Sequence, residues 1–278
     1  MENIVAISAA LGAVVGLILA LTGAGGAILA VPLLLFVLHL SVAAAAPIAL
    51  LAVGLSAAVG ALLGLRAGIV RYRAALLMAV SGTVFSPIGL WFAHRLPNGP
   101  LTLLFAAVLA FVAWRMFTQA AANQPQQPAA TPPAAAGLAA QPCQLDNRSG
   151  RFVWTASCTR ALALSGVGAG FLSGLLGVGG GFVIVPALKR ATNAPLHTIV
   201  ATSLAVITLV SASGVVSTAM AGRMNWQVGV PFAAGAMLAM LGGRLVASRL
   251  SGARLQQGFA VVAGLIAIGM LAKVAMAA

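Results

Sequence analysis

Two glycine-rich breaks hold the residues of this chain that are best suited to bind a ligand. The first break is residues 22–26, Thr-Gly-Ala-Gly-Gly, and the second is residues 176–180, Leu-Gly-Val-Gly-Gly. Each break lies between two apolar segments and is followed by a proline, Pro32 or Pro186. A helix that restarts after such a break presents unpaired N–H groups at its positive dipole end. Such an end can bind an anion without any cationic side chain.

The residues near the breaks have a structural interpretation as well as a functional one. The glycines could serve only tight turns and close helix packing, and the hydroxyls could bond back to their own helix. The two prolines are interpreted as hinges or as simple kinks. Two copies of the break at equivalent places favour a solute site. The candidate site residues are Thr22, Gly23, Gly25, Gly26, Gly177, Gly179, Gly180, Thr202 and Ser203, with Pro32 and Pro186 as candidate hinges.

The segments that must position these residues are apolar almost throughout. The chain has 278 residues, of which 62% are hydrophobic and 6% charged, and this excludes a soluble globular domain. Its apolar runs have the length of membrane-spanning helices. The expected segments are 4–21, 26–40, 42–65, 72–93, 100–117, 161–176, 180–190, 195–221, 226–247 and 254–276. The first two of each half are short, and residues 180–190 reach only about 16 Å as a helix.

An internal duplication relates the two halves of the chain. The glycines at 23 and 177 lie 154 positions apart (177 − 23), and the same offset aligns Gly, Pro, Arg and Phe residues elsewhere. The predicted fold is an all-α polytopic membrane protein with an inverted repeat of five plus five segments, about 8–10 of them transmembrane. The first two segments of each half are expected to be short or re-entrant. The predicted domains are 1–118, a linker at 119–159 and 160–278, and residues 143–154 of the linker are interpreted as a small hairpin.

The basic residues indicate the orientation of the chain. With an odd number of segments in each half, one side receives 12 of the 15 Lys and Arg residues and the other receives three. The positive-inside rule places the larger group in the cytoplasm, so the linker is predicted to be cytoplasmic and both termini periplasmic, in the inner membrane. The net charge of +13 is therefore attributed to topology, and no nucleic-acid partner is expected.

The other reactive side chains predict no enzyme. The only acidic residues are Glu2 and Asp146, and neither lies inside an apolar segment, which excludes schemes with paired carboxylates. The three histidines have no metal-ligand spacing, so neither a metal nor a cofactor is expected. Cys143 and Cys158 are interpreted as ordinary reduced thiols, as the predicted cytoplasmic compartment implies.

The chain resembles the TauE/SafE family of sulfite-exporter-like membrane proteins. The resemblance rests on residues 23–26 and 177–181, on the Val-Pro pair after each break, and on residues 197–204, His-Thr-Ile-Val-Ala-Thr-Ser-Leu. It covers nearly the whole chain except the linker. It implies transport of small sulfur-containing anions, such as sulfite and organosulfonates, across the bacterial inner membrane. The first half has Pro-Ile-Ala at 47–49 where the second half has Ala-Thr-Ser at 201–203, so hydroxyl contacts are expected from the second half.

The function predicted from these features is secondary transport of a small anion, with sulfite or an organosulfonate as substrate and export as the favoured direction. The alternatives are a membrane accessory or assembly factor that transports nothing, and a transporter of an unrelated small solute. The expected partners are the anion and the lipid bilayer. The sequence does not choose between H⁺ and Na⁺ as a coupling ion, nor does it give the oligomeric state.

Overall fold

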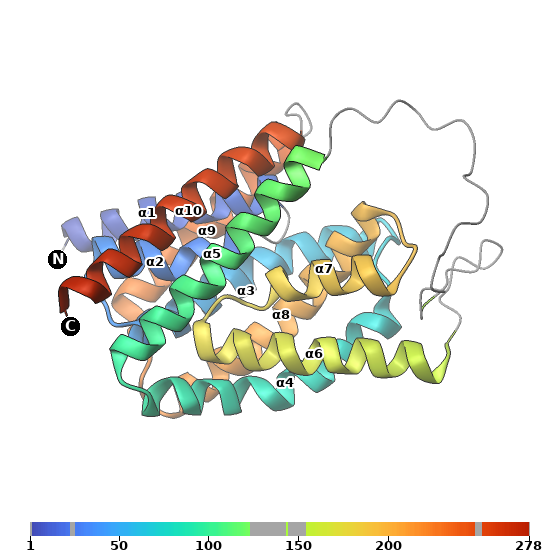
Figure 1. The fold of residues 1–278 in the computed structure, drawn as a ribbon, viewed down its shortest axis with the longest axis horizontal. Coiled ribbons are helices and arrows are strands. Elements are labelled where there is room, and N and C mark those ends of the chain that lie inside the picture. The colour runs from blue at the N-terminus through green and yellow to red at the C-terminus, as the bar shows by residue number, and fades with distance from the viewer. Residues whose placement is uncertain (1, 23–25, 123–142, 144–153, 248–251, 278) are drawn as a thin grey trace.

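The chain folds into helices that match the ten expected segments. The computed structural model describes residues 2–22, 26–122, 143, 154–247 and 252–277 (Figure 1). The elements are α1 (Glu2–Thr22), η1 (Gly26–Leu29), α2 (Ala30–Val37), α3 (Val42–Arg66), α4 (Tyr72–Arg95), α5 (Asn98–Ala122), α6 (Ala156–Leu176), α7 (Gly181–Ala191), α8 (Leu196–Met220), α9 (Trp226–Ala247) and α10 (Gly252–Ala277). The described residues contain no β-strand, and the expected all-α class is confirmed.

Five of the described helices are long and apolar enough to cross a membrane. They are α3, α4, α6, α8 and residues 226–243 of α9. Local sequence fixes where several helices begin: Ser41 caps α3 by accepting from the amide of Ala44, and Thr155 caps α6 by accepting from that of Cys158. The second segment of each half is short, as expected, because α2 has 8 residues and α7 has 11. Helix α5 continues to Ala122 and α6 begins at Ala156, so both helices extend into the stretch 119–159 that was predicted as linker.

Helices of one half pack mainly on helices of the other half. The principal contacts join α1 to α9, α4 to α6, α3 to α8 and α5 to α10, and α3 also contacts α9 as α4 contacts α8. In Figure 1, α6 lies beside α4 and α5 beside α10. Under the 154-residue offset, each of these contacts maps either onto another in the set or onto itself. The helix contacts therefore have the symmetry that the predicted duplication implies.

Glycines on the first helix of each half bring two backbones into direct contact. A Cβ added at any of these glycines would collide with the main chain of the facing helix, so no larger residue fits there. The residue numbers rise together along both helices of each pair, so α1 runs parallel to α9 and α6 runs parallel to α4. The contacting pairs are Gly12 with Phe232, Gly16 with Ala236, Gly166 with Met78 and Gly170 with Gly82.

Helices α3 and α8 cross at the centre of the molecule. Gly54 lies against Ser211, Gly60 against Leu204 and Gly64 against Ala201. Because the numbers fall along α8 as they rise along α3, the two helices are antiparallel. Both are largely buried along the crossing, and their apolar side chains form much of the core.

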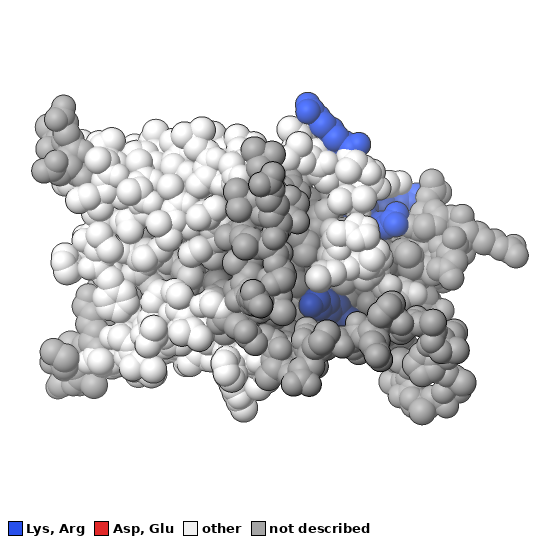
Figure 2. Space-filling model, turned by 90° about the horizontal axis from the view of Figure 1, so that it is seen from above, with Lys and Arg blue, Asp and Glu red and all other residues white. Residues whose placement is uncertain are grey.

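Basic side chains gather at one end of the molecule. In the face seen in Figure 2, the visible Lys and Arg side chains lie toward the right-hand end, the end at which α6 begins in Figure 1. Both the start of α1 and the end of α10 lie at the opposite end (Figure 1). The basic residues at the ends of α3, α4, α6 and α7 on this side are Arg66, Arg71, Arg73, Arg160, Lys189 and Arg190.

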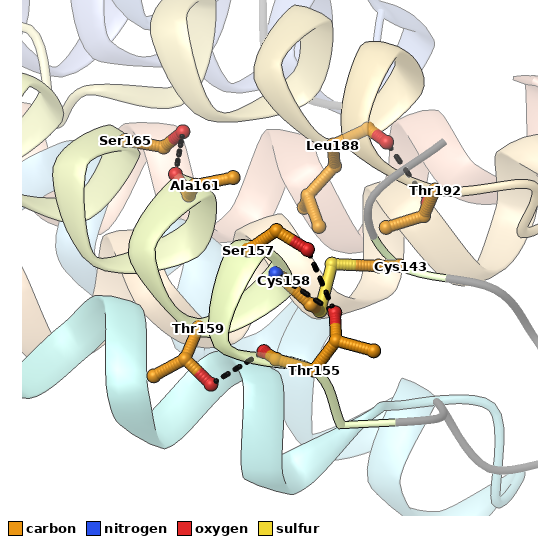
Figure 3. Close-up of a disulfide and its surroundings, with 9 residues drawn as sticks. All are labelled: Cys143, Thr155, Ser157, Cys158, Thr159, Ala161, Ser165, Leu188 and Thr192. Carbon is orange, nitrogen blue, oxygen red and sulfur yellow. Dashed lines mark hydrogen bonds between the residues drawn. A yellow bond between two sulfur atoms is a disulfide. The ribbon is translucent and has the colours of Figure 1, made fainter. Parts of the chain in front are cut away.

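The two cysteines form a disulfide, so the expectation of reduced thiols was wrong. Cys143 and Cys158 are bonded across a sequence separation of 15, and both are fully buried (Figure 3). Cys158 belongs to the first turn of α6, while the amide of Cys143 donates to the carbonyl of Ala191 at the end of α7, over 2.9 Å. The disulfide therefore links the beginning of α6 to Cys143, whose backbone pairs with the end of α7. The expectation failed because it used only the compartment and ignored the distance between the cysteines. The hairpin predicted at 143–154 falls mostly on residues outside the described part of the chain.

Candidate functional site

The second glycine break is a buried turn that only glycine adopts without strain. Gly177 ends α6 with φ of 71°, Gly179 has φ of 71°, and Gly180 caps α7 with φ of 70°. Side chains with a Cβ rarely take this left-handed conformation. All three glycines are buried. The sequence Gly-x-Gly-Gly thus produces a sharp reversal between two helices inside the protein.

Close neighbours surround the break on two sides. A Cβ on Gly177 would collide with the backbone of Ala46 on α3, and one on Gly180 would lie 2.7 Å from the carbonyl oxygen of Ala169 on α6. These positions therefore require glycine for space as well as for backbone conformation. The turn is held firmly between α3 and α6.

Gly179 reaches the point where the two halves of the chain meet. A Cβ built on it would lie 2.9 Å from Val53 Cγ1 and 3.1 Å from Ile207 Cγ2. Val53 and Ile207 are equivalent residues of the two halves, because 207 − 53 equals the repeat offset of 154. The same Cβ would lie 3.3 Å from the hydroxyl oxygen of Ser211. The break therefore extends to the crossing of α3 and α8.

The start of α7 offers backbone donors at this turn. The carbonyl of Gly180 accepts from the amides of Val183 and Ile184, at 3.0 and 3.1 Å. The amides of Gly181 and Phe182 precede this first bonded turn, so the helix gives them no partner. The α7 dipole adds partial positive charge at the same place. The arrangement can stabilise an anion or a carbonyl-like oxygen without a charged side chain.

The first break lies mostly outside the described residues, which omit 23–25. Thr22 ends α1, and Gly26 begins the 3₁₀ turn η1, whereas the equivalent position of the second half caps an α-helix directly. Pro32 therefore falls in the first turn of α2, where a proline costs no hydrogen bond, and Pro186 falls inside α7. Their role as hinges stays a prediction.

Thr202 and Ser203 are buried, but each already has a hydrogen-bond partner. The Thr202 hydroxyl accepts from the amide of Arg71, the N-cap residue of α4, over 3.1 Å. The Ser203 hydroxyl donates to the carbonyl of Val200 on its own helix, over 2.8 Å. Thr202 lies nine positions before Ser211 on α8, which is about 13 Å along a helix axis. The structure thus brings Gly177, Gly179 and Gly180 together, whereas Thr202 and Ser203 lie away from them, near the beginning of α8.

A second group of hydroxyls was missed in the sequence. Among the described residues, five fully buried serine hydroxyls have no hydrogen-bond partner: Ser8, Ser56, Ser86, Ser173 and Ser211. Serines in helices usually donate back to a preceding carbonyl, as Ser165 does to Ala161 at 2.7 Å. An unpaired buried hydroxyl is costly, so each needs a partner from outside the chain or a functional reason. The sequence could have indicated them only as hydroxyls whose equivalents in the other half are apolar.

Comparisons with known proteins agree with the membrane architecture. The model of the family described as "Sulfite exporter TauE/SafE" matches residues 8–270. A "Probable membrane transporter protein" of Xylella fastidiosa strain Temecula1 is 28% identical over 251 residues, which cover 87% of this chain and 85% of the relative. The "Probable membrane transporter protein YunE" of Bacillus subtilis is 40% identical over 79 residues, 28% of each chain. No solved structure gives a significant match.

Proposed function

Because the chain belongs to the sulfite exporter TauE/SafE family of membrane transporters, we propose that it carries a small anion, sulfite or an organosulfonate, out of the cell. The chain is a multi-pass membrane protein, as its long apolar helices and its relatives indicate. The identity of the anion and the direction of transport are the parts that we add. They combine the family resemblance with the chemistry of the second break.

The observation that carries this proposal is the buried second break beside the crossing of α3 and α8. It joins left-handed glycines, the first amides of α7 and a nearby hydroxyl in one place. A site of N–H and O–H donors suits an oxyanion. A buried cationic side chain would bind the anion more tightly than these neutral donors do. Weaker binding suits a transporter, because it must also release the anion.

We also propose that the two halves are inverted relative to each other in the membrane. The contact registers support this arrangement, since α1 is parallel to α9 and α6 to α4. Contacts of Gly60 with Met240 and of Gly229 with Leu51 make α3 parallel to α9, while α3 and α8 are antiparallel. Contacts of Gly82 with Val210 and of Gly214 with Ser86 make α4 parallel to α8. Together these registers support opposite directions for α1 and α6, the first helices of the two halves. Inverted halves of this kind are typical of secondary transporters.

We propose that the protein lies in the inner membrane, and we assign the end of the molecule at which α6 begins, next to the linker, to the cytoplasm. The 12-to-3 distribution of basic residues supports this assignment. Export of an anion is then favoured by the negative interior, by about 2.3 kcal/mol per charge at 100 mV. Under this assignment the Cys143–Cys158 disulfide would lie in a reducing compartment, where disulfides are rare and usually transient.

Transport by the purified protein in liposomes tests the proposal. Vesicles loaded with sulfite should release it faster with the protein than without it, and Gly180→Leu should abolish the difference. Leucine at this position would collide with the carbonyl of Ala169 and would strain a left-handed residue. Sulfate and methanesulfonate in the same assay define the range of anions.

The same assay separates the alternatives. If wild-type vesicles release neither sulfite nor the other anions above the empty-vesicle rate, anion transport is refuted and an accessory role in a larger complex is favoured. If they release other small solutes but no oxyanion, the substrate class is wrong while the transport function holds.

A further inference from the structure

The unpaired hydroxyl of Ser211 marks a binding position that the glycine motif alone does not define. Ser211 is 0% exposed, and its Oγ has no hydrogen-bond partner. This oxygen lies 3.3 Å from the place that a Cβ on Gly179 would take, so the hydroxyl stands directly beside the break. Other hydroxyls of α8, such as those of Thr208 and Thr218, donate to their own helix at 2.8 Å.

Two further serines with unpaired hydroxyls lie on helices next to this position. Ser173 belongs to the last turn of α6, and its carbonyl accepts from the amide of Gly177 at 2.8 Å. The Ser86 hydroxyl on α4 lies 3.4 Å from the Cβ position of Gly214, which follows Ser211 by one helical turn. Unpaired hydroxyls thus belong to three helices, α4, α6 and α8, that pack on one another beside the second break.

The positions equivalent to these three serines in the duplication carry no hydroxyl. Under the 154-residue offset, Ser211 corresponds to Ala57, Ser86 to Met240 and Ser173 to Leu19. The duplication therefore does not repeat this group of three hydroxyls.

We propose that Ser211, with Ser86 and Ser173, forms the polar wall of a single oxyanion site at the second glycine break. The ligand accepts hydrogen bonds from these hydroxyls and from the first amides of α7. This inference rests on the proposed anion transport and adds to it one asymmetric site, with donors that differ from the predicted Thr202 and Ser203.

Binding to the full chain in lipid nanodiscs tests the site. Sodium sulfite, sulfate and methanesulfonate are titrated against wild-type protein and Ser211→Ala by calorimetry. Losing one hydrogen bond to a charged ligand should weaken binding by at least about tenfold. Thr218→Val is the matched control, because its hydroxyl is buried on the same helix but already bonded; it should bind as the wild type does.

The thermal stability of the ligand-free variants gives a second readout. Removing an unpaired buried hydroxyl should leave the unfolding midpoint unchanged or raise it, so weaker binding by Ser211→Ala would not reflect misfolding. If Ser211→Ala does not fold, Ser173→Ala is measured in its place, with the same expected loss.

The outcomes separate the two proposals. Wild-type binding that Ser211→Ala retains within twofold overturns the hydroxyl site and leaves anion transport standing. Absence of wild-type binding to all three anions overturns both.

Discussion

The hydroxyl oxygen of Ser211 lies 3.3 Å from the position that a Cβ on Gly179 would occupy. The second glycine break, which repeats the first at an offset of 154 positions, therefore lies next to a serine that belongs to no sequence motif. We therefore expect some substitutions at the second break to abolish transport while the protein still folds.

Gly179→Ala should abolish transport, because its methyl group would enter the space beside Ser211 and Val53. Gly222→Ala is the matched control: it has a similar φ of 66°, but nothing lies within 4 Å of the added Cβ. Both variants carry a left-handed alanine that costs about 1–2 kcal/mol. Sulfite release from liposomes should be lost only in Gly179→Ala, and equal loss in both would show that backbone strain alone is responsible.

Gly170→Val should weaken the fold itself. Position 170 on α6 touches the backbone of Gly82 on α4, and valine would force the two helices apart at a cost of about 1–3 kcal/mol or more. Gly168→Val, two residues earlier on the same helix, should be tolerated, because a Cβ added there has no atom within 4 Å. The yield of monodisperse protein and its unfolding midpoint in detergent measure the difference. Similar midpoints for the two variants would contradict the close contact of α4 and α6.

The disulfide should stabilise the region around the start of α6. A bond that closes a loop of 15 residues contributes about 3 kcal/mol in the chain-entropy model. Mass spectrometry after thiol blocking should find no modified cysteine in the oxidised protein and two after reduction. Cys143→Ser should lower the unfolding midpoint under oxidising conditions and have little effect under reducing ones. A midpoint difference that survives reduction would assign the effect to packing at position 143.

The orientation can be tested on the same two cysteines. Intact spheroplasts are treated first with a membrane-impermeant reductant and then with an impermeant maleimide; the reduction is needed because a disulfide does not react. With the linker end in the cytoplasm, Cys143 and Cys158 should stay unlabelled, whereas lysed spheroplasts should give label. Label in the intact cells would reverse the topology.

Repetition and apolar length were sufficient to predict the all-α class and the positions of the helices. All ten segments and the short second helix of each half could be read from the sequence, because long apolar runs and an offset of 154 positions are local or periodic signals. The partners of single polar groups were not predictable in this way. Thr202 was selected as a donor to the solute, yet it accepts from Arg71, 131 positions away. Which hydroxyl is left unpaired depends on contacts between distant helices.

The glycine contacts between α1 and α9 also affect how the protein is made. Gly12 rests on the backbone of Phe232, 220 positions later in the chain (232 − 12). During synthesis, α1 is therefore made long before its main partner, α9. Until α9 is made, the glycine face of α1 contacts lipids or other helices. Neither half contains both members of this pair, so either half made alone lacks the surface on which its first helix rests. Both halves must therefore be made before either can complete its fold.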